Sequence, residues 1–183
     1  RLCVYELATG KKNYVSEKFD SNVEGFVWNK DNKSLSFIGV WHGTLNLYQA
    51  NFKGEVKQIT NEWADYGSIS LANNGNKLLA TKASMSHPTD IYIVTPGKNA
   101  KSTKVEQITR ENDHILNQLN MGKCEQRWVK TTDGKQMLVW IMLPSNFDAN
   151  KKYPTLLFCE GGPQSPVSQF WSYRWNIQIM AAN

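Results

Sequence analysis

The stretch Tyr153-Pro-Thr-Leu-Leu-Phe-Cys-Glu-Gly-Gly-Pro-Gln-Ser-Pro166 decides how the chain is interpreted. Its apolar run, Thr155 to Cys159, has the length of a buried strand and ends abruptly at two glycines and a proline. Glycine permits a positive φ or a close approach to a ligand, and Pro163 prevents the strand from continuing. A strand that ends in a Gly-Gly turn before an aromatic-rich helix is typical of α/β enzymes, which place backbone amides at the carboxyl edge of a sheet.

The apolar pattern after Pro166 predicts a helix from about Ser168 towards Asn183. Two stripes of apolar residues recur at helical spacing: Phe170, Tyr173, Ile177 and Met180 on one face, and Trp171, Trp175 and Ile179 on the other. We expect such a helix to pack against a sheet on one side and a second layer on the other.

A β-hairpin is predicted before the opening stretch. Residues 124–132 and 135–143 are strand-like and flank Asp133-Gly134, a pair that favours a type I′ turn. Apolar side chains occur at both odd and even positions from Met137 to Leu143, so we expect this sheet to be covered on both faces. Cys159, inside the apolar run, is expected to be a small buried residue.

Residues 1 to about 112 contain an internal repeat. Tyr5, Tyr48 and Tyr92 lie in similar strand–turn segments, 43 and 44 residues apart. The pentapeptides 56–60 and 105–109 are nearly identical, and two hairpin patterns, 27–37 and 70–80, repeat with the same offset. A repeat of about 40–45 residues with four strands indicates the blade of a β-propeller.

The predicted fold is mixed and β-rich, with two parts that meet near residue 115. Residues 1–115 form about two and a half propeller blades, and residues 116–183 begin an α/β-hydrolase domain. We expect the three repeated tyrosines, Trp28 and Trp41 to pack between blades rather than stack on a ligand.

Composition excludes several classes of function. The chain has 183 residues, 21 basic and 16 acidic, and its lysines are scattered, which argues against nucleic-acid binding. No apolar run is long enough to span a membrane. The wide spacing of the cysteines and histidines argues against a disulfide framework, a zinc site or another metal site, and no cofactor is expected. These residues are Cys3, Cys124 and Cys159, with His42, His87 and His114 expected on the surface or in loops.

The order of these features resembles the prolyl oligopeptidase family of serine peptidases. Propeller blades are followed by Glu125-x-x-x-Val-x-Thr-Thr-Asp-Gly-Lys, a Leu-Pro-x-x-Phe segment, Lys152-Tyr-Pro, an apolar strand and Gly161-Gly162-Pro163. Bacterial dipeptidyl-peptidases and acylaminoacyl-peptidases have the most similar pattern. The resemblance implies a propeller that caps a hydrolase domain and a peptide substrate cleaved by Ser-Asp-His acyl transfer.

The resemblance places the catalytic triad outside this chain. The family's serine lies in a G-x-S-x-G turn, which this sequence lacks, and its aspartate and histidine follow. We therefore expect all three beyond Asn183, so that the 183-residue chain is inactive by itself. Because the chain begins without an initiator methionine, we expect it to be a piece of a longer protein.

The candidate site residues in the chain are Glu160, Gly161 and Gly162. Relatives of the family carry tyrosine or histidine near the oxyanion hole at the position of Glu160, but an ionised carboxylate cannot donate to an oxyanion. Glu160 could bind the substrate's cationic N-terminus or a nearby arginine, form a structural ion pair with a Lys or Arg outside this chain, or be a solvated turn residue. The two glycines are expected to shape the pocket wall, or only a tight turn.

Two other functions compete with the peptidase. A TolB-like propeller that only binds would explain the repeat but not the second part, and a carboxylesterase-like hydrolase would not need the repeat. The resemblance favours a bacterial, periplasmic protein over a cytoplasmic one. Unpaired edge strands predict homo-oligomers of the isolated chain, formed by strand exchange.

Overall fold

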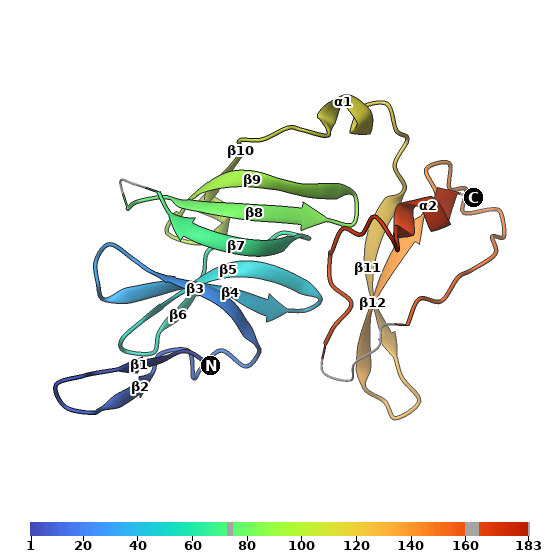
Figure 1. Ribbon diagram of the computed structural model, residues 1–183. Coiled ribbons are helices and arrows are strands. Elements are labelled where there is room, and N and C mark those ends of the chain that lie inside the picture. Colours follow the sequence, from blue (N-terminus) through green and yellow to red (C-terminus); the bar gives the residue numbers. More distant parts are fainter. Residues whose placement is uncertain (73–74, 160–164, 183) are drawn as a thin grey trace.

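The computed structural model describes residues 1–72, 75–159 and 165–182. These residues form a mostly β structure with few helices, and Figure 1 shows a larger β region beside a smaller one that begins at the hairpin β11–β12. The elements are, in chain order, β1 (Cys3–Tyr5), β2 (Lys12–Tyr14), β3 (Val23–Trp28), β4 (Ser34–Trp41), β5 (Thr44–Asn51), β6 (Val56–Gln58), β7 (Asp65–Leu71), β8 (Leu78–Ser84), β9 (His87–Thr95), η1 (Ala100–Ser102), β10 (Lys104–Gln107), α1 (Asp113–Leu116), β11 (Lys123–Lys130), β12 (Gln136–Leu143) and α2 (Ile177–Ala182).

The internal repeat corresponds to two four-stranded antiparallel units. Strands β3 to β6 form the first unit and β7 to β10 the second, each in sequential order. A single parallel pair, Leu45 opposite Asp65, joins the two units through β5 and β7. Both predicted hairpins, β3–β4 and β7–β8, are therefore confirmed, and β1–β2 pair separately from these units.

The apolar core lies on both faces of the first four-stranded unit. Successive side chains of a strand point to opposite faces, so Phe37 and Ile38 of β4 enter different clusters. The first cluster consists of Leu2, Val15, Phe19, Leu35, Phe37, Tyr48 and Ala50. The second consists of Ile38, Leu47, Ile59, Tyr66, Leu78, Ala80 and Val94, and lies between the two units.

The expected packing of the repeated aromatic residues holds only in part. Tyr48 and Tyr92 are buried, whereas Tyr5, Trp28 and Trp41 are each about half exposed, at 53%, 44% and 42%. Trp28 instead contacts the ring of Phe52 edge-on, and Trp41 stacks on the neighbouring His42.

The predicted β11–β12 hairpin is confirmed, but its loop is not a type I′ turn. Of the loop residues only Gly134 has a positive φ, 83°, and its N–H donates to the Thr131 carbonyl. This is the geometry of a type I turn followed by a left-handed glycine. A type I′ turn instead joins β4 to β5, where His42 and Gly43 have φ of 49° and 67°.

The prediction that both faces of this hairpin are covered was wrong. None of the side chains of β11 and β12 is buried, and Trp128 and Met137 remain about half exposed. In the described part of the chain, α2, the β4–β5 turn and a few single side chains contact the hairpin, which is too little to cover two faces.

The prediction of a helix from Ser168 was also wrong for most of that segment, in which only α2 is helical. The Ser172 hydroxyl accepts hydrogen bonds from the N–H groups of Arg174 and Trp175. The Asn176 side chain then accepts from the N–H groups of Gln178 and Ile179, which makes it the N-cap. Hydrogen bonds between side chains and nearby backbone groups compete with the backbone hydrogen bonds of a helix. The helical spacing of the apolar residues was therefore not sufficient to form a helix from Ser168.

The apolar run 155–159 has no regular secondary structure and does not join any sheet of the described residues. Leu156 and Leu157 are 77% and 81% exposed, and Cys159 is exposed rather than buried. A strand needs a neighbour to bond its backbone groups, and no described residues lie paired beside this run.

Candidate functional site

The predicted site residues Glu160, Gly161 and Gly162 lie outside the described residues. The structure does show how the chain continues after them. Residues 165–169 run between the β-rich region and the β11–β12 hairpin and lead towards α2 (Figure 1). We call residues 165–169 the connecting segment.

Asp65, the first residue of β7, binds the connecting segment. Its carboxylate accepts a hydrogen bond from the Ser168 hydroxyl at 2.6 Å and from the Gln169 N–H at 3.1 Å. Burial raises the pKa of Asp65 above its ordinary value, and these two hydrogen bonds partly oppose the shift. The contact joins residues more than 100 positions apart in the sequence.

Gln169 extends this contact to the hairpin. It is 2% exposed, and its side-chain amide lies 3.6 Å from the Cys124 sulfur on β11. That sulfur lies 3.8 Å from the Met85 sulfur in the β8–β9 turn. Burial raises the pKa of the Cys124 thiol, which favours the unreactive protonated form.

Gln178 of α2 makes a second polar contact between the two regions. Its side-chain oxygen accepts from the Gly122 N–H at 2.7 Å, and its amide donates to the Gly122 carbonyl at 3.2 Å and the Ser86 hydroxyl at 2.8 Å. Ser86 belongs to the β8–β9 turn, so α2 is attached to the β-rich region as well as to the segment before β11.

Aromatic side chains surround the β4–β5 turn where it meets the hairpin. The ring of His42 contacts Trp128 edge-on, with ring centroids 5.1 Å apart, and Trp63 contacts Trp140 in the same way at 5.3 Å. A Cβ added to Gly43 would lie 2.6 Å from the Trp140 Nε1 atom, so glycine is required here by both space and positive φ.

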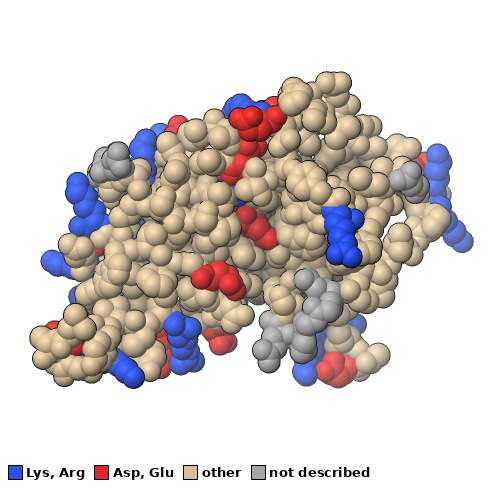
Figure 2. Space-filling view, in the orientation of Figure 1, with Lys and Arg blue, Asp and Glu red and all other residues tan. Residues whose placement is uncertain are grey.

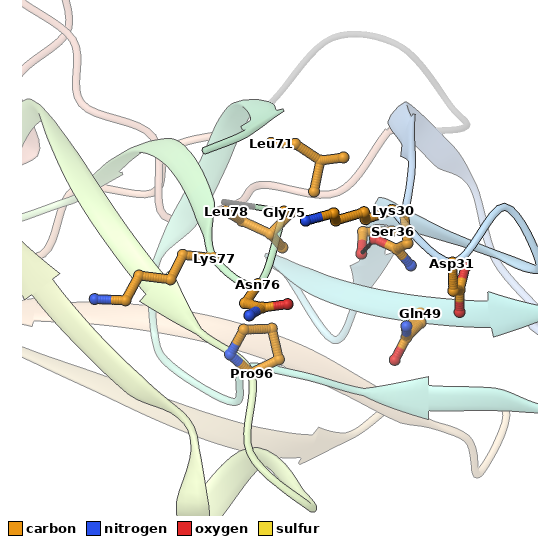
Figure 3. A pocket seen from close by; sticks show the side chains of 11 residues that line it. Lys30, Asp31, Ser36, Gln49, Leu71, Gly75, Asn76, Lys77, Leu78 and Pro96 are labelled. Carbon is orange, nitrogen blue, oxygen red and sulfur yellow. Dashed lines mark hydrogen bonds between the residues drawn. The ribbon is translucent and has the colours of Figure 1, made fainter. Parts of the chain in front are cut away.

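A cavity of about 250 Å³ lies elsewhere, between the β3–β4 and β7–β8 turns (Figure 3). Lys30 reaches over Gly75, while Lys77 points away from the other side chains (Figure 3). The hydrogen bond that the Lys33 N–H donates to the Asp31 carboxylate holds the pKa of Asp31 below its ordinary value. Asp31 and Ser36 line this cavity, but the Asp31 carboxylate accepts hydrogen bonds from Lys33 and Ser34, and the Ser36 hydroxyl donates to Asn29. We therefore assign no catalytic chemistry to this cavity.

Three side chains outside the connecting segment lie close enough together to share a metal ion. Ligand atoms of His87, Asp90 and Asp113 lie within 4.8 Å of one another. Asp90 already accepts hydrogen bonds from Thr109 and Gln107, and Arg110 pairs with Asp113. His87 was expected on the surface or in a loop, but it begins β9 and is partly buried. The long sequence separation of Asp113 concealed the cluster.

The basic side chains are scattered over the face of the molecule that Figure 2 shows, as the sequence predicted. Figure 2 shows Lys and Arg side chains spread around the edge of this face and mixed with acidic ones. Among the described residues, no helix has the length and hydropathy to cross a membrane.

Comparison with known proteins relates nearly the whole chain to peptidases. No protein-family model matches the chain. Dipeptidyl-peptidase 5 of Porphyromonas gingivalis is 44% identical over 182 residues, which are 99% of this chain and 26% of that protein. Dipeptidyl-peptidase 5 of Schizosaccharomyces pombe is 30% identical over 189 residues, again 99% of this chain and 26% of the relative. The chain thus spans about a quarter of the length of these relatives.

Solved structures show the same fold. Acylaminoacyl peptidase of Pyrococcus horikoshii superposes with a TM-score of 0.74 at 21% identity, over 94% of this chain and 25% of that one. An acylaminoacyl peptidase in complex with Z-Gly-Gly-Phe-chloromethyl ketone gives the same TM-score, identity and coverage. The chain is therefore a relative, along nearly all of its length, of the peptidases of the prolyl oligopeptidase family.

Proposed function

We propose that this chain is part of a serine peptidase that hydrolyses short peptides in the manner of a dipeptidyl- or acylaminoacyl-peptidase. The observation that carries the proposal is the 44% identity to a dipeptidyl-peptidase 5, which extends through both regions of the chain. A propeller that only binds, or a carboxylesterase without a propeller, would account for one region and leave the other unexplained.

Within this proposal, residues 1–115 are the last blades of a β-propeller. The two four-stranded antiparallel units and the separate pair β1–β2 support about two and a half blades. Each unit buries a sheet face against its neighbour, as blades do.

Residues 116–183 begin the hydrolase domain in the same proposal. The apolar run 155–159 would become a strand when the remaining strands of the hydrolase sheet lie beside it. Because the chain has no G-x-S-x-G, we place the nucleophile, aspartate and histidine beyond Asn183.

The function is tested with the full-length protein, with the 183-residue chain as the matched control. A fluorophosphonate probe, which reacts with activated serines, should label the full-length protein at one site and leave the chain unlabelled. Labelling of the chain would show that the nucleophile had been misplaced, and no labelling of the full-length protein would refute the serine peptidase.

Substrate choice separates the two peptidase types. A dipeptidyl-p-nitroanilide with a free N-terminus should be cleaved faster than an N-acetylated amino-acid p-nitroanilide if the enzyme is a dipeptidyl-peptidase. The opposite preference would identify an acylaminoacyl-peptidase.

The role of Glu160 remains a prediction with three alternatives. If the carboxylate binds the cationic N-terminus of the substrate, Glu160→Gln should raise KM for the dipeptidyl-p-nitroanilide and leave the acetylated substrate unaffected. If it forms a structural ion pair, the variant should lower stability and affect both substrates equally. No effect on either would identify a solvated turn residue.

A further inference from the structure

Asp65 occupies a junction between three parts of the molecule. Its backbone pairs with Leu45 of the first four-stranded unit and with Ala83 of the second. Its side chain binds Ser168 and Gln169 of the connecting segment. One residue of the β-rich region therefore fixes a segment that belongs to the second region.

The position of this contact in the sequence places it close to the candidate site residues. Ser168 follows the Gly161-Gly162 pair by six residues, so a shift of the connecting segment would be transmitted over a short length of chain. The backbone of Asp65, by contrast, is held in the β5–β7 and β7–β8 pairings and provides a fixed reference point.

We propose that Asp65 is a positioning residue of the peptidase, which acts through Ser168 and Gln169 to hold the connecting segment against the β-rich region. This inference rests on the proposed function. A carboxylate suits the task because it accepts from the Ser168 hydroxyl and the Gln169 N–H at once, each with a separate oxygen. An amide side chain has only one acceptor oxygen, so it cannot offer each donor an oxygen of its own.

Hydrogen exchange of the 183-residue chain tests whether Asp65 anchors the connecting segment through its two hydrogen bonds. We call this pair of hydrogen bonds the anchor. Asp65→Asn should speed exchange of the Gln169 amide about tenfold, because one charge-assisted hydrogen bond is lost. Exchange in β4 and β5 should stay unchanged. Asp20→Asn, an exposed aspartate with the same change of charge, is the control and should leave the connecting segment unchanged.

Kinetics of the full-length protein test whether the anchor positions the site. Asp65→Asn should lower kcat about tenfold with little change in KM, since misplaced groups lose transition-state contacts. Ser168→Ala should give a smaller loss, and the double variant should be no slower than Asp65→Asn alone, because both remove the same contact.

The outcomes separate this inference from the proposed function. Faster exchange confined to the connecting segment, with a non-additive loss of kcat, supports it. Unchanged exchange, equal acceleration in both regions, or faster exchange with a wild-type kcat overturns it. If the full-length wild type fails to react with the fluorophosphonate probe, the peptidase proposal is refuted independently of Asp65. Hydrogen exchange then still shows whether the anchor exists.

Discussion

The two regions of the molecule are held together by different forces. Every buried apolar side chain of the described structure lies at or before Val94. After residue 112 the described residues that are buried are two glutamines, Gln169 and Gln178. Both donate across the boundary, Gln169 through its backbone N–H to Asp65 and Gln178 through its side-chain amide to Ser86. The first region is thus stabilised by its own core, whereas the second depends on polar and aromatic contacts with the first.

The difference has a visible consequence at the surface. Leu156, Leu157 and Tyr173 of the second region are each about 80% exposed. Contiguous exposed apolar residues commonly mark a surface that another element covers. The comparison therefore predicts that substitutions in the first region affect folding, and that substitutions in the second affect association and contact between regions.

The largest effect should come from the core of the first region. Phe37 is fully buried between Phe19 and Tyr48, so Phe37→Ala should lower the free energy of unfolding by about 3–5 kcal/mol. Leu157→Ala should change it by less than about 0.5 kcal/mol, because Leu157 is exposed. Urea unfolding measures both, and similar losses for the two variants would contradict the comparison.

A smaller effect is expected where the regions touch. Gly43→Ala forces a Cβ to within 2.6 Å of Trp140 and adds strain at a positive φ, so we expect a loss of about 2–4 kcal/mol. Gly54→Ala, also at a positive φ but with open space around it, is the control and should cost about 1 kcal/mol. Equal losses in urea unfolding would mean that the contact with Trp140 contributes nothing.

Association should depend on the second region. The isolated chain is expected to self-associate through its exposed edges and the run 155–159, which light scattering at high concentration would detect. The double variant Leu156→Lys/Leu157→Lys should weaken association about tenfold or more. A monomeric wild-type chain would refute this expectation.

The smallest effects are pH-dependent and opposite in sign for two aspartates. The pKa of Asp31 is lowered, chiefly by the Lys33 N–H bond, so its contribution to stability is present above the ordinary value of 3.8 and is lost as pH falls through the lowered pKa. The pKa of Asp65 is raised by burial, so its contribution is present below 3.8 and is lost as pH rises through the raised pKa.

Asparagine variants measure these contributions. From about pH 3 to pH 6, the free energy of unfolding of wild type minus Asp31→Asn should rise with pH, and that of wild type minus Asp65→Asn should fall. Parallel slopes for the two variants would show that Asp65 is not desolvated at the junction.

Local patterns predicted the first region well and the second poorly. The repeated strands and the hairpins β3–β4, β7–β8 and β11–β12 follow from alternation and turn residues, which act between close neighbours. The helix predicted from Ser168 failed because Ser172 and Asn176 bond to nearby backbone and start α2 later. The strand predicted for 155–159 failed because a strand requires a partner, and apolarity alone supplies none.

The candidate site was predicted as a stretch of sequence, not as a set of contacts. Glu160, Gly161 and Gly162 were singled out by their residue types and by the family resemblance, and their roles stay predictions. The contacts of Asp65, Gln169 and Gln178 were missed, since nothing in a lone Asp or Gln shows which distant backbone group it will bind.

The sequence by itself determined the repeat and its turns, because these depend on residues within one blade length of each other. It also determined the likeness to prolyl oligopeptidase-type peptidases, because this likeness depends on the order of motifs along the chain. The tertiary structure alone decided that Asp65 meets Gln169, which lies 104 positions away. The physical reason is that such a contact forms only after both regions have folded and closed the chain between them, which no local pattern encodes.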